Sequence, residues 1–131
     1  MSVPRQPSPL GSKLGLTLLE VGAQRTVATM PVEGNTQPYG ILHGGALLAL
    51  GEEVGSIAAN QHAQTHGKVC VGLDVSATHH RATRRGTVTA TARPLHLGGR
   101  VATYAVEIRD DHEHLVSTFS ITCMLIDPRP E

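Results

Sequence analysis

The sequence has little aromatic character: its 131 residues include two tyrosines, one phenylalanine and no tryptophan. A surface that binds single-stranded nucleic acid by stacking bases on aromatic rings is therefore not expected. Net charge is missing as well, because 11 basic residues balance 11 acidic ones, which argues against binding nucleic acid or an anionic membrane through bulk charge. The core has to be built from aliphatic side chains instead.

Cysteine is also scarce, with Cys70 and Cys123 each standing alone in an apolar stretch. Single cysteines in such surroundings are usually buried, reduced thiols rather than disulfide partners or nucleophiles, which fits a cytoplasmic protein. Long apolar runs are absent too: the first 13 residues contain no signal-peptide core, and no segment approaches the length of a membrane span. We therefore expect no membrane partner.

Metal-ligand spacing is missing from the sequence despite its eight histidines. The pairs His79-His80 and His112-x-His114 have no accompanying cysteine, and neither belongs to a His-Glu-x-x-His pattern. We expect neither a metal ion nor another cofactor.

What the sequence does contain is the pattern of one α+β domain. Residues 1–13 are expected to form a flexible N-terminal arm, and residues 14–127 a single domain. Apolar residues recur at helical spacing from Gly44, which predicts one long central helix that ends within residues 61–67. The predicted packing lays an antiparallel sheet around this helix. Its strands are expected at 16–21 and 25–32, followed by a four-stranded meander at 68–79, from 85 onward, at 101–109 and at 115–126.

A loop delivers His43 and two glycines to the start of the predicted helix. The free N–H groups of a helix's first turn carry partial positive charge and can hold a developing oxyanion. Gly44 and Gly45 have no Cβ, so a substrate carbonyl can approach these groups closely. Glu52 follows two turns later, on a helix face of small residues that we expect to be covered, which would place its carboxylate in poor solvent near the substrate carbon.

Five blocks of residues follow one another in the sequence. They are Gln-Pro-Tyr-Gly-Ile-Leu-His-Gly-Gly at 37–45, Glu52 with Val-Gly-Ser at 54–56, Val-Gly-Leu-Asp at 71–74, Thr78-His79 with Arg81, and Pro-Leu-His-Leu-Gly-Gly-Arg at 94–100. Together these blocks resemble the hotdog-fold acyl-CoA thioesterases, from about residue 37 to residue 126, and are nearest to the 1,4-dihydroxy-2-naphthoyl-CoA thioesterase, enterobactin proofreading and phenylacetate-pathway-like branch. The resemblance implies a hotdog fold and hydrolysis of an aromatic or medium-chain acyl-CoA to free acid and coenzyme A.

The resemblance also implies roles for individual residues. Glu52 matches the family's catalytic carboxylate, either as a nucleophile or as a general base on water. The Gly44 backbone N–H matches the donor to the thioester carbonyl, Gln37 and His43 match side chains beside the thioester, and Ser56 matches a hydroxyl that orients the carboxylate or the water. Family sites lie between two subunits, so a homodimer, and usually a tetramer of paired dimers, is implied.

The coenzyme A groove is implied by the same resemblance. Arg81 and Arg100 are candidate phosphate ligands, since a guanidinium holds phosphate oxygens in a bidentate fork. One departure is Glu53, a second carboxylate that we expect to point away from the site. The acyl pocket is expected at Tyr39, Leu42 and Leu48 or at their counterparts in the partner subunit. The predicted groove residues are Gly72, His79, His80, Arg81, Ala82, His96, Leu97, Gly98, Gly99, Arg100 and Val101.

Two other functions fit parts of the same pattern. A hotdog dehydratase or hydratase acting on a 3-hydroxyacyl thioester also pairs a loop histidine with a helix carboxylate. A non-catalytic acyl-CoA-binding protein would keep the groove and lose the chemistry. Retention of Glu52, Gln37 and His43 favours hydrolysis over binding alone.

Overall fold

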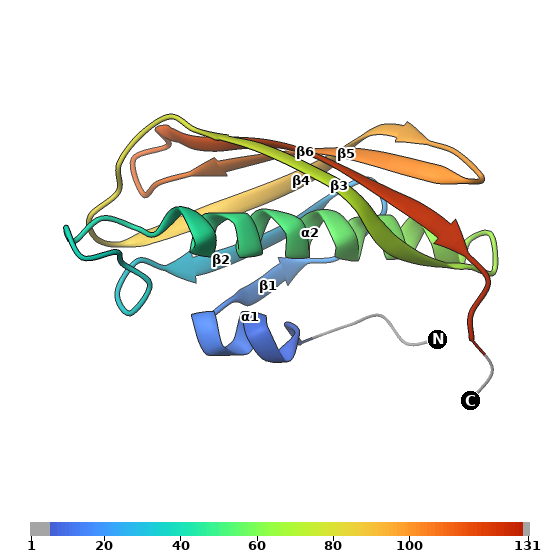
Figure 1. Cartoon of the computed structure of the whole chain (residues 1–131), viewed down its shortest axis with the longest axis horizontal. Coiled ribbons are helices and arrows are strands. Elements are labelled where there is room, and N and C mark those ends of the chain that lie inside the picture. The colour runs from blue at the N-terminus through green and yellow to red at the C-terminus, as the bar shows by residue number, and fades with distance from the viewer. Residues whose placement is uncertain (1–5, 130–131) are drawn as a thin grey trace.

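A computed structural model describes residues 6–129, and in it a six-stranded antiparallel sheet curves around one long helix (Figure 1). This is the α+β hotdog architecture that the sequence predicts. The short helix α1 (Pro9–Leu14) comes first, followed by β1 (Thr17–Glu20), β2 (Thr26–Pro31) and the central helix α2 (Gly44–Gln64). The remaining strands are β3 (Val69–His79), β4 (Thr87–Leu97), β5 (Val101–Arg109) and β6 (Leu115–Ile126).

The strand order is β1-β2-β4-β5-β6-β3, so the predicted four-stranded meander is wrong for its first strand. β4, β5 and β6 do follow one another as hairpins, but β3 pairs with β6 and leaves β2 to pair with β4. Segment 80–86 carries the chain from the β3 edge to the interior position of β4. Local residue patterns show that a segment is a strand but not which neighbour it takes, because pairing is decided by the whole sheet.

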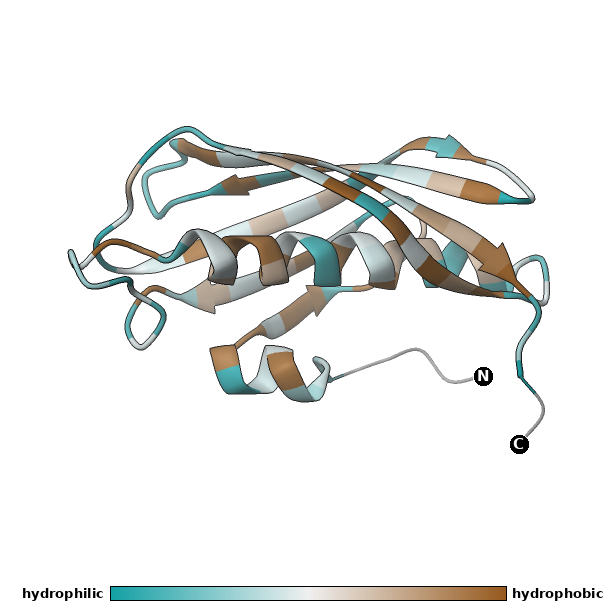
Figure 2. Cartoon of the chain, viewed as in Figure 1, coloured by the Kyte–Doolittle hydropathy of each residue, from teal (hydrophilic) through white to brown (hydrophobic). Residues whose placement is uncertain are grey.

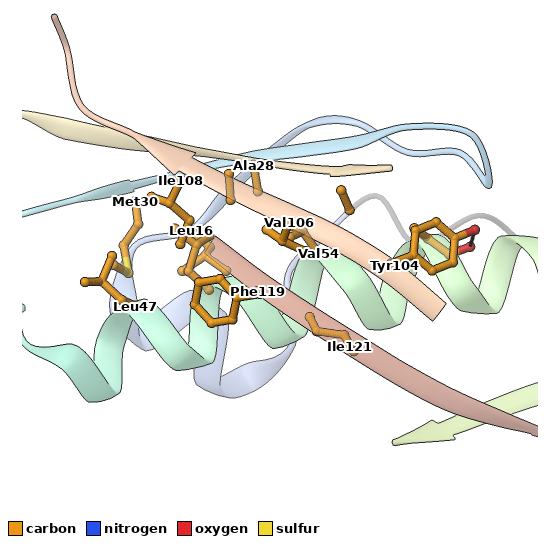
Figure 3. Close-up of a cluster of buried hydrophobic side chains, with 14 of the residues drawn as sticks. Leu16, Ala28, Met30, Leu47, Val54, Tyr104, Val106, Ile108, Phe119 and Ile121 are labelled. Carbon is orange, nitrogen blue, oxygen red and sulfur yellow. Dashed lines mark hydrogen bonds between the residues drawn. The ribbon is translucent and has the colours of Figure 1, made fainter. Parts of the chain in front are cut away.

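The core lies between α2 and the concave face of the sheet. Leu50, Val54 and Ala58 are fully buried there, in one core cluster with aliphatic residues of β4, β5 and β6. Figure 3 shows Val54 among core residues of β5 and β6 such as Val106 and Ile121. At Gly51 an added Cβ would lie 2.6 Å from the Phe119 ring, and at Gly55 it would lie 2.5 Å from Ile121 Cδ1. These two glycines therefore allow the sheet to pack directly against the helix backbone, which offsets their low helix propensity.

The short helix α1 (Pro9–Leu14) begins within the segment predicted as an N-terminal arm, residues 1–13. Ser8 caps α1 by accepting a hydrogen bond from the Gly11 N–H at 3.0 Å, Pro9 begins the helix, and Gly15 ends it with φ of +81°. A serine cap, an early proline and a left-handed glycine are strong helix boundaries even for six residues. Residues 1–5 of the predicted arm lie outside the described residues.

β3 forms one edge of the sheet and carries apolar residues along its length (Figure 2). A register shift between Gly72 and Asp74 changes which side chains face the helix, so that Val75 and Ala77 pack against the core while Val71 and Leu73 are 43% and 52% exposed. An 11-residue edge strand with exposed apolar side chains is a ready surface for pairing with another strand. None of the helices formed by residues 6–129 is both long and apolar enough to cross a membrane.

Candidate active site

His43 begins α2 as its N-cap, in an extended conformation, and its Nδ1 accepts a hydrogen bond from the Gly45 N–H at 2.8 Å. Its own N–H donates to the Asn35 carbonyl oxygen at 2.9 Å, which fixes the loop against the helix start. Within residues 6–129 no group accepts a hydrogen bond from the Gly44 N–H. A capped helix therefore presents one free, positively polarised donor at Gly44.

A hollow of about 290 Å³ opens at this helix start. His79 reaches it from the end of β3: its Nδ1 lies 2.8 Å from Ser117 Oγ, and its Nε2 lies 3.2 Å from where a Cβ on Gly44 would be. Glycine at position 44 thus permits both the close approach of His79 and access to the backbone donor. The predicted site residues that line this hollow are Gln37, Leu42, Gly44, His79, His80, Arg81 and Ala82.

Glu52 and Ser56 lie in a different hollow, of about 460 Å³, further along α2. The eight residues from Gly44 to Glu52 correspond to about 12 Å along the helix axis, too far for one thioester group to meet both within one chain. Glu52 is exposed here, because the opposite face of α2 is covered only in part by the N-terminal segment. The expectation of a carboxylate in poor solvent is therefore wrong for a single chain.

Two thiols lie close to one another, and one of them lies close to Ser56 of this second hollow. Cys70 of β3 and Cys123 of β6 are both free, and the Cys70 Sγ donates to the Ala59 carbonyl oxygen at 3.4 Å. The neighbouring Cys70 side chain and, to a smaller extent, the Ser56 hydroxyl lower the pKa of Cys123 to about 7, against the opposing effect of burial. The Cys123 side chain and burial raise the pKa of Cys70. The Ser56 hydroxyl thus faces a thiol as well as the hollow that contains Glu52.

The predicted coenzyme A residues fall at two ends of the molecule. His79 to Ala82 lie at the start of α2, whereas His96 to Val101 surround the β4–β5 turn near its end, where the His62 Nε2 donates to the Gly98 carbonyl oxygen at 2.7 Å. The two ends of α2 are about 30 Å apart. Gly72 is exposed on the β3 edge. One chain therefore does not join these residues into one groove.

The two arginines predicted to bind phosphate are both exposed. The Arg81 Nε lies 3.8 Å from Asp110 Oδ2. Burial would raise the pKa of that carboxyl, but backbone hydrogen bonds from His114 and His112 outweigh it and hold the pKa below its usual value. Asp110 therefore stays ionised beside Arg81, and a phosphate would compete with it for the guanidinium.

Three residues that position the site carried no sequence signal of their own. Asn35 donates through its Nδ2 to the Leu14 and Pro31 carbonyl oxygens, at 2.7 and 2.8 Å. Asn60 accepts from the Cys70 N–H at 2.8 Å and so joins α2 to β3. Ser117 holds His79, as described above. Their partners are distant in sequence, so only the tertiary structure reveals these contacts.

No cluster of three or more histidine, cysteine, aspartate or glutamate side chains suited to a metal ion occurs within residues 6–129. The chemistry available at the two hollows is that of a backbone amide, a carboxylate and hydrogen-bonding side chains. Such a set can stabilise an oxyanion and deliver a nucleophile or a base.

Comparison with known families gives this geometry its context. The family model of the thioesterase superfamily matches residues 39–117, which include the capped helix start, Glu52 and the β3 edge. The chain belongs to the thioesterase superfamily. This confirms the predicted family resemblance and makes the chain a thioester hydrolase by class.

Relatives within the thioesterase superfamily cover most of the chain. It is 38% identical over 114 residues to the 1,4-dihydroxy-2-naphthoyl-CoA hydrolase of Escherichia coli, covering 86% of this chain and 83% of that one. It is 37% identical over 114 residues to the proofreading thioesterase EntH of Cronobacter sakazakii, covering 86% and 82%. The crystal structure of a Haemophilus influenzae thioesterase superposes with a TM-score of 0.85 at 38% identity, covering 90% and 82%.

Proposed function

We propose that this thioesterase hydrolyses an acyl-CoA, with water as the second substrate and a free acid and the coenzyme A thiol as products. In this proposal the Gly44 N–H of one subunit polarises the thioester carbonyl, and Glu52 of a second subunit supplies the carboxylate. The observation that carries it is the free Gly44 donor at a helix start that His43 caps and Asn35 anchors. An amide fixed in this way needs no reorganisation when the carbonyl oxygen becomes negative.

The separation of Gly44 from Glu52 supports a site made by two chains. If a two-fold axis passes α2 halfway between them, at residue 48, antiparallel packing places Gly44 of one helix opposite the Glu52 of its neighbour. Residue 48 is a leucine that is 40% exposed, which is an apolar contact suited to such an axis. The partner helix would also cover the face that one chain leaves open, and so provide the poor solvent that Glu52 lacks.

The exposed β3 edge supports the same dimer. Pairing two β3 strands about a two-fold axis would satisfy their free backbone groups and cover Val71 and Leu73. It would also carry the β4–β5 turn of one subunit toward the helix start of the other, so that the two groups of predicted coenzyme A residues border one groove. We propose this homodimer, with a tetramer of paired dimers as its further assembly.

Either role of Glu52 completes the reaction. As a nucleophile, its oxygen forms a bond to the acyl carbon while the C–S bond breaks, and water then hydrolyses the mixed anhydride. As a general base, it takes a proton from water as the water oxygen attacks, and the thiolate leaves with the proton returned to sulfur. Ser56 would hold the carboxylate or the water, and Gln37 and His43 would position the thioester.

The reaction is tested by following thiol release from a panel of acyl-CoA substrates. We expect wild-type turnover and a loss of at least about 1,000-fold in kcat for Glu52→Ala, because the variant loses the group that forms or activates the nucleophile. Glu33→Ala, at an exposed loop carboxylate, serves as the control. Activity of Glu52→Ala within about tenfold of wild type would overturn the assignment. Formation of an enoyl product with the thioester intact would point to a dehydratase instead.

The compartment is a further expectation. Free Cys70 and Cys123 suit a reducing environment, which supports the proposal of a cytoplasmic enzyme.

A further inference from the structure

We infer that the helix α1, fastened to α2 by Glu53, forms a wall of the acyl pocket and selects the acyl group. The inference rests on the proposed function, since it assigns the acyl side of the same site. Its basis is that the N-terminal segment lines the hollow that contains Glu52: Gln6, Pro7, Ser8 and Leu10 face Glu52 and Ser56 across it. The residues predicted to line the acyl pocket do not enclose one within a single chain: Leu42 is buried and lines the hollow at Gly44, whereas Tyr39 is 84% exposed and Leu48 is 40% exposed. Their counterparts in a partner subunit stay a prediction.

Glu53 fastens the beginning of α1. The Ser8 N–H donates to Glu53 Oε2 at 2.9 Å, and the Ser8 hydroxyl donates to Oε1 while accepting from the Gly11 N–H. A Cβ added at Gly11 would lie 2.6 Å from Glu53 Oε2, so the carboxylate sits directly against the α1 backbone. Glu53 is therefore a positioning residue, adjacent in sequence to the proposed catalytic Glu52 and half-buried beneath α1.

Asn35 fastens the other end of α1. Its Nδ2 donates to the Leu14 carbonyl oxygen at 2.7 Å, and its backbone carbonyl accepts from the N–H of His43. The same residue thus holds the end of α1 and the loop that caps α2. Because α1 is fixed at both ends, its side chains form a defined wall rather than a fraying terminus.

The wall borders two adjoining hollows. The first contains Glu52, and the second, of about 350 Å³, extends toward the start of α2 between Leu10, Leu14, Ala46 and Ala49. Leu10 and Ala49 line both, so they stand where the two hollows meet. An acyl group attached to a thioester at Glu52 therefore has a mainly apolar space to enter, and its passage runs between Leu10 and Ala49. The polar residues Asn35, Thr36 and His43 also line this space.

The chemistry of this space selects apolar acyl groups of ring or medium-chain size. Leu10 is 57% exposed in one chain, so its side chain is available for substrate rather than committed to the core. For each substrate methylene that loses contact with such a wall, the kcat/KM ratio of the longer over the shorter substrate falls by about tenfold or more. Short acyl groups that end before Leu10 should not sense α1.

The test compares octanoyl-CoA with butyryl-CoA in wild type, Leu10→Ala, Leu10→Trp and Glu53→Gln. We expect the ratio of kcat/KM for octanoyl-CoA over butyryl-CoA to fall about tenfold in Leu10→Ala and Leu10→Trp, through a higher KM for octanoyl-CoA. Glu53→Gln cannot accept both Ser8 hydrogen bonds, so its ratio should fall in the same direction. Ser12→Ala, at an exposed position of the same helix, is the matched control.

Binding of octyl-CoA and butyl-CoA thioethers, which cannot be hydrolysed, separates the two proposals. If wild type turns over no acyl-CoA, the proposed function fails, but a Leu10-dependent preference for the octyl thioether would still support the wall. If the octanoyl preference and the octyl preference stay within about twofold of wild type in all three variants, α1 is not a wall of the acyl pocket. Hydrogen exchange at residues 8–14 should rise in Glu53→Gln and stay unchanged in Ser12→Ala.

Discussion

The two faces of α2 differ in how far a single chain completes them. On one face Leu50, Val54 and Ala58 are fully buried against the sheet, and Gly51 and Gly55 admit Phe119 and Ile121 to the helix backbone. On the other face Gly45, Leu48 and Glu52 remain exposed, and only the α1 segment lies over part of it. The core face therefore serves folding within one chain, and the open face is where we propose that a second chain and the substrate bind.

A mixed-subunit experiment tests the open face most strongly. Glu52→Ala and Gly44→Val should each be nearly inactive, the second because a side chain there meets His79 and blocks the donor. When the two variants are co-expressed in equal amounts, about a quarter of the sites would combine an intact Gly44 with an intact Glu52 from different chains. Thiol release should return to about that fraction of the wild-type rate. No recovery, with circular dichroism showing folded protein, would mean that the site is not shared.

Two leucines on the same helix test the difference in folding. Leu50→Ala should lower the free energy of unfolding by about 2–5 kcal/mol, because it leaves a cavity in the core. Leu48→Ala, two residues earlier on the open face, should cost under about 1 kcal/mol within the chain. Denaturant unfolding of both variants, at protein concentrations low enough to keep them in one assembly state, measures these two free energies. Equal losses would contradict the division into two faces.

The smallest effect on stability is expected away from both faces of α2, at Asp110 in the β5–β6 turn. The pKa of Asp110 is lower in the folded chain than its usual value, so its ionised form contributes stability that is present above the unfolded pKa and is lost as pH falls through the folded one. The Tm difference between wild type and Asp110→Asn should therefore shrink between about pH 6 and about pH 3. A Tm difference that widens as the pH falls would contradict a lowered pKa of Asp110 in the folded chain.

The sequence predicts the elements well because their signals are local. Periodic Leu47, Leu50 and Val54 place the central helix, and turn residues separate the strands within a few positions of where they lie. The cap at His43 is likewise visible as a loop histidine before two glycines. These features depend on residues near one another in the chain, where spacing alone carries the information.

Other features could not be read from spacing, because they depend on contacts between distant segments. β3 takes the edge beside β6, and Glu53 meets Ser8 from 45 residues away. The separation of Gly44 from Glu52 into two hollows follows from the helix rise. Whether the two residues share one site depends on the proposed second chain. From the sequence we expect Glu53 to point away from the site. In the structure Glu53 lies against α1 and lines the Glu52 hollow.

The capping of α2 by His43 restricts what that ring can do during turnover. The His43 Nδ1 already accepts a hydrogen bond from the Gly45 N–H, so only Nε2 is available to the substrate. In the neutral ring with Nδ1 as the acceptor, Nε2 carries the hydrogen. In the proposed site His43 would therefore contact the thioester or the departing sulfur as a hydrogen-bond donor. Any scheme in which it removes a proton would first have to break the helix cap that keeps the neighbouring amide in place.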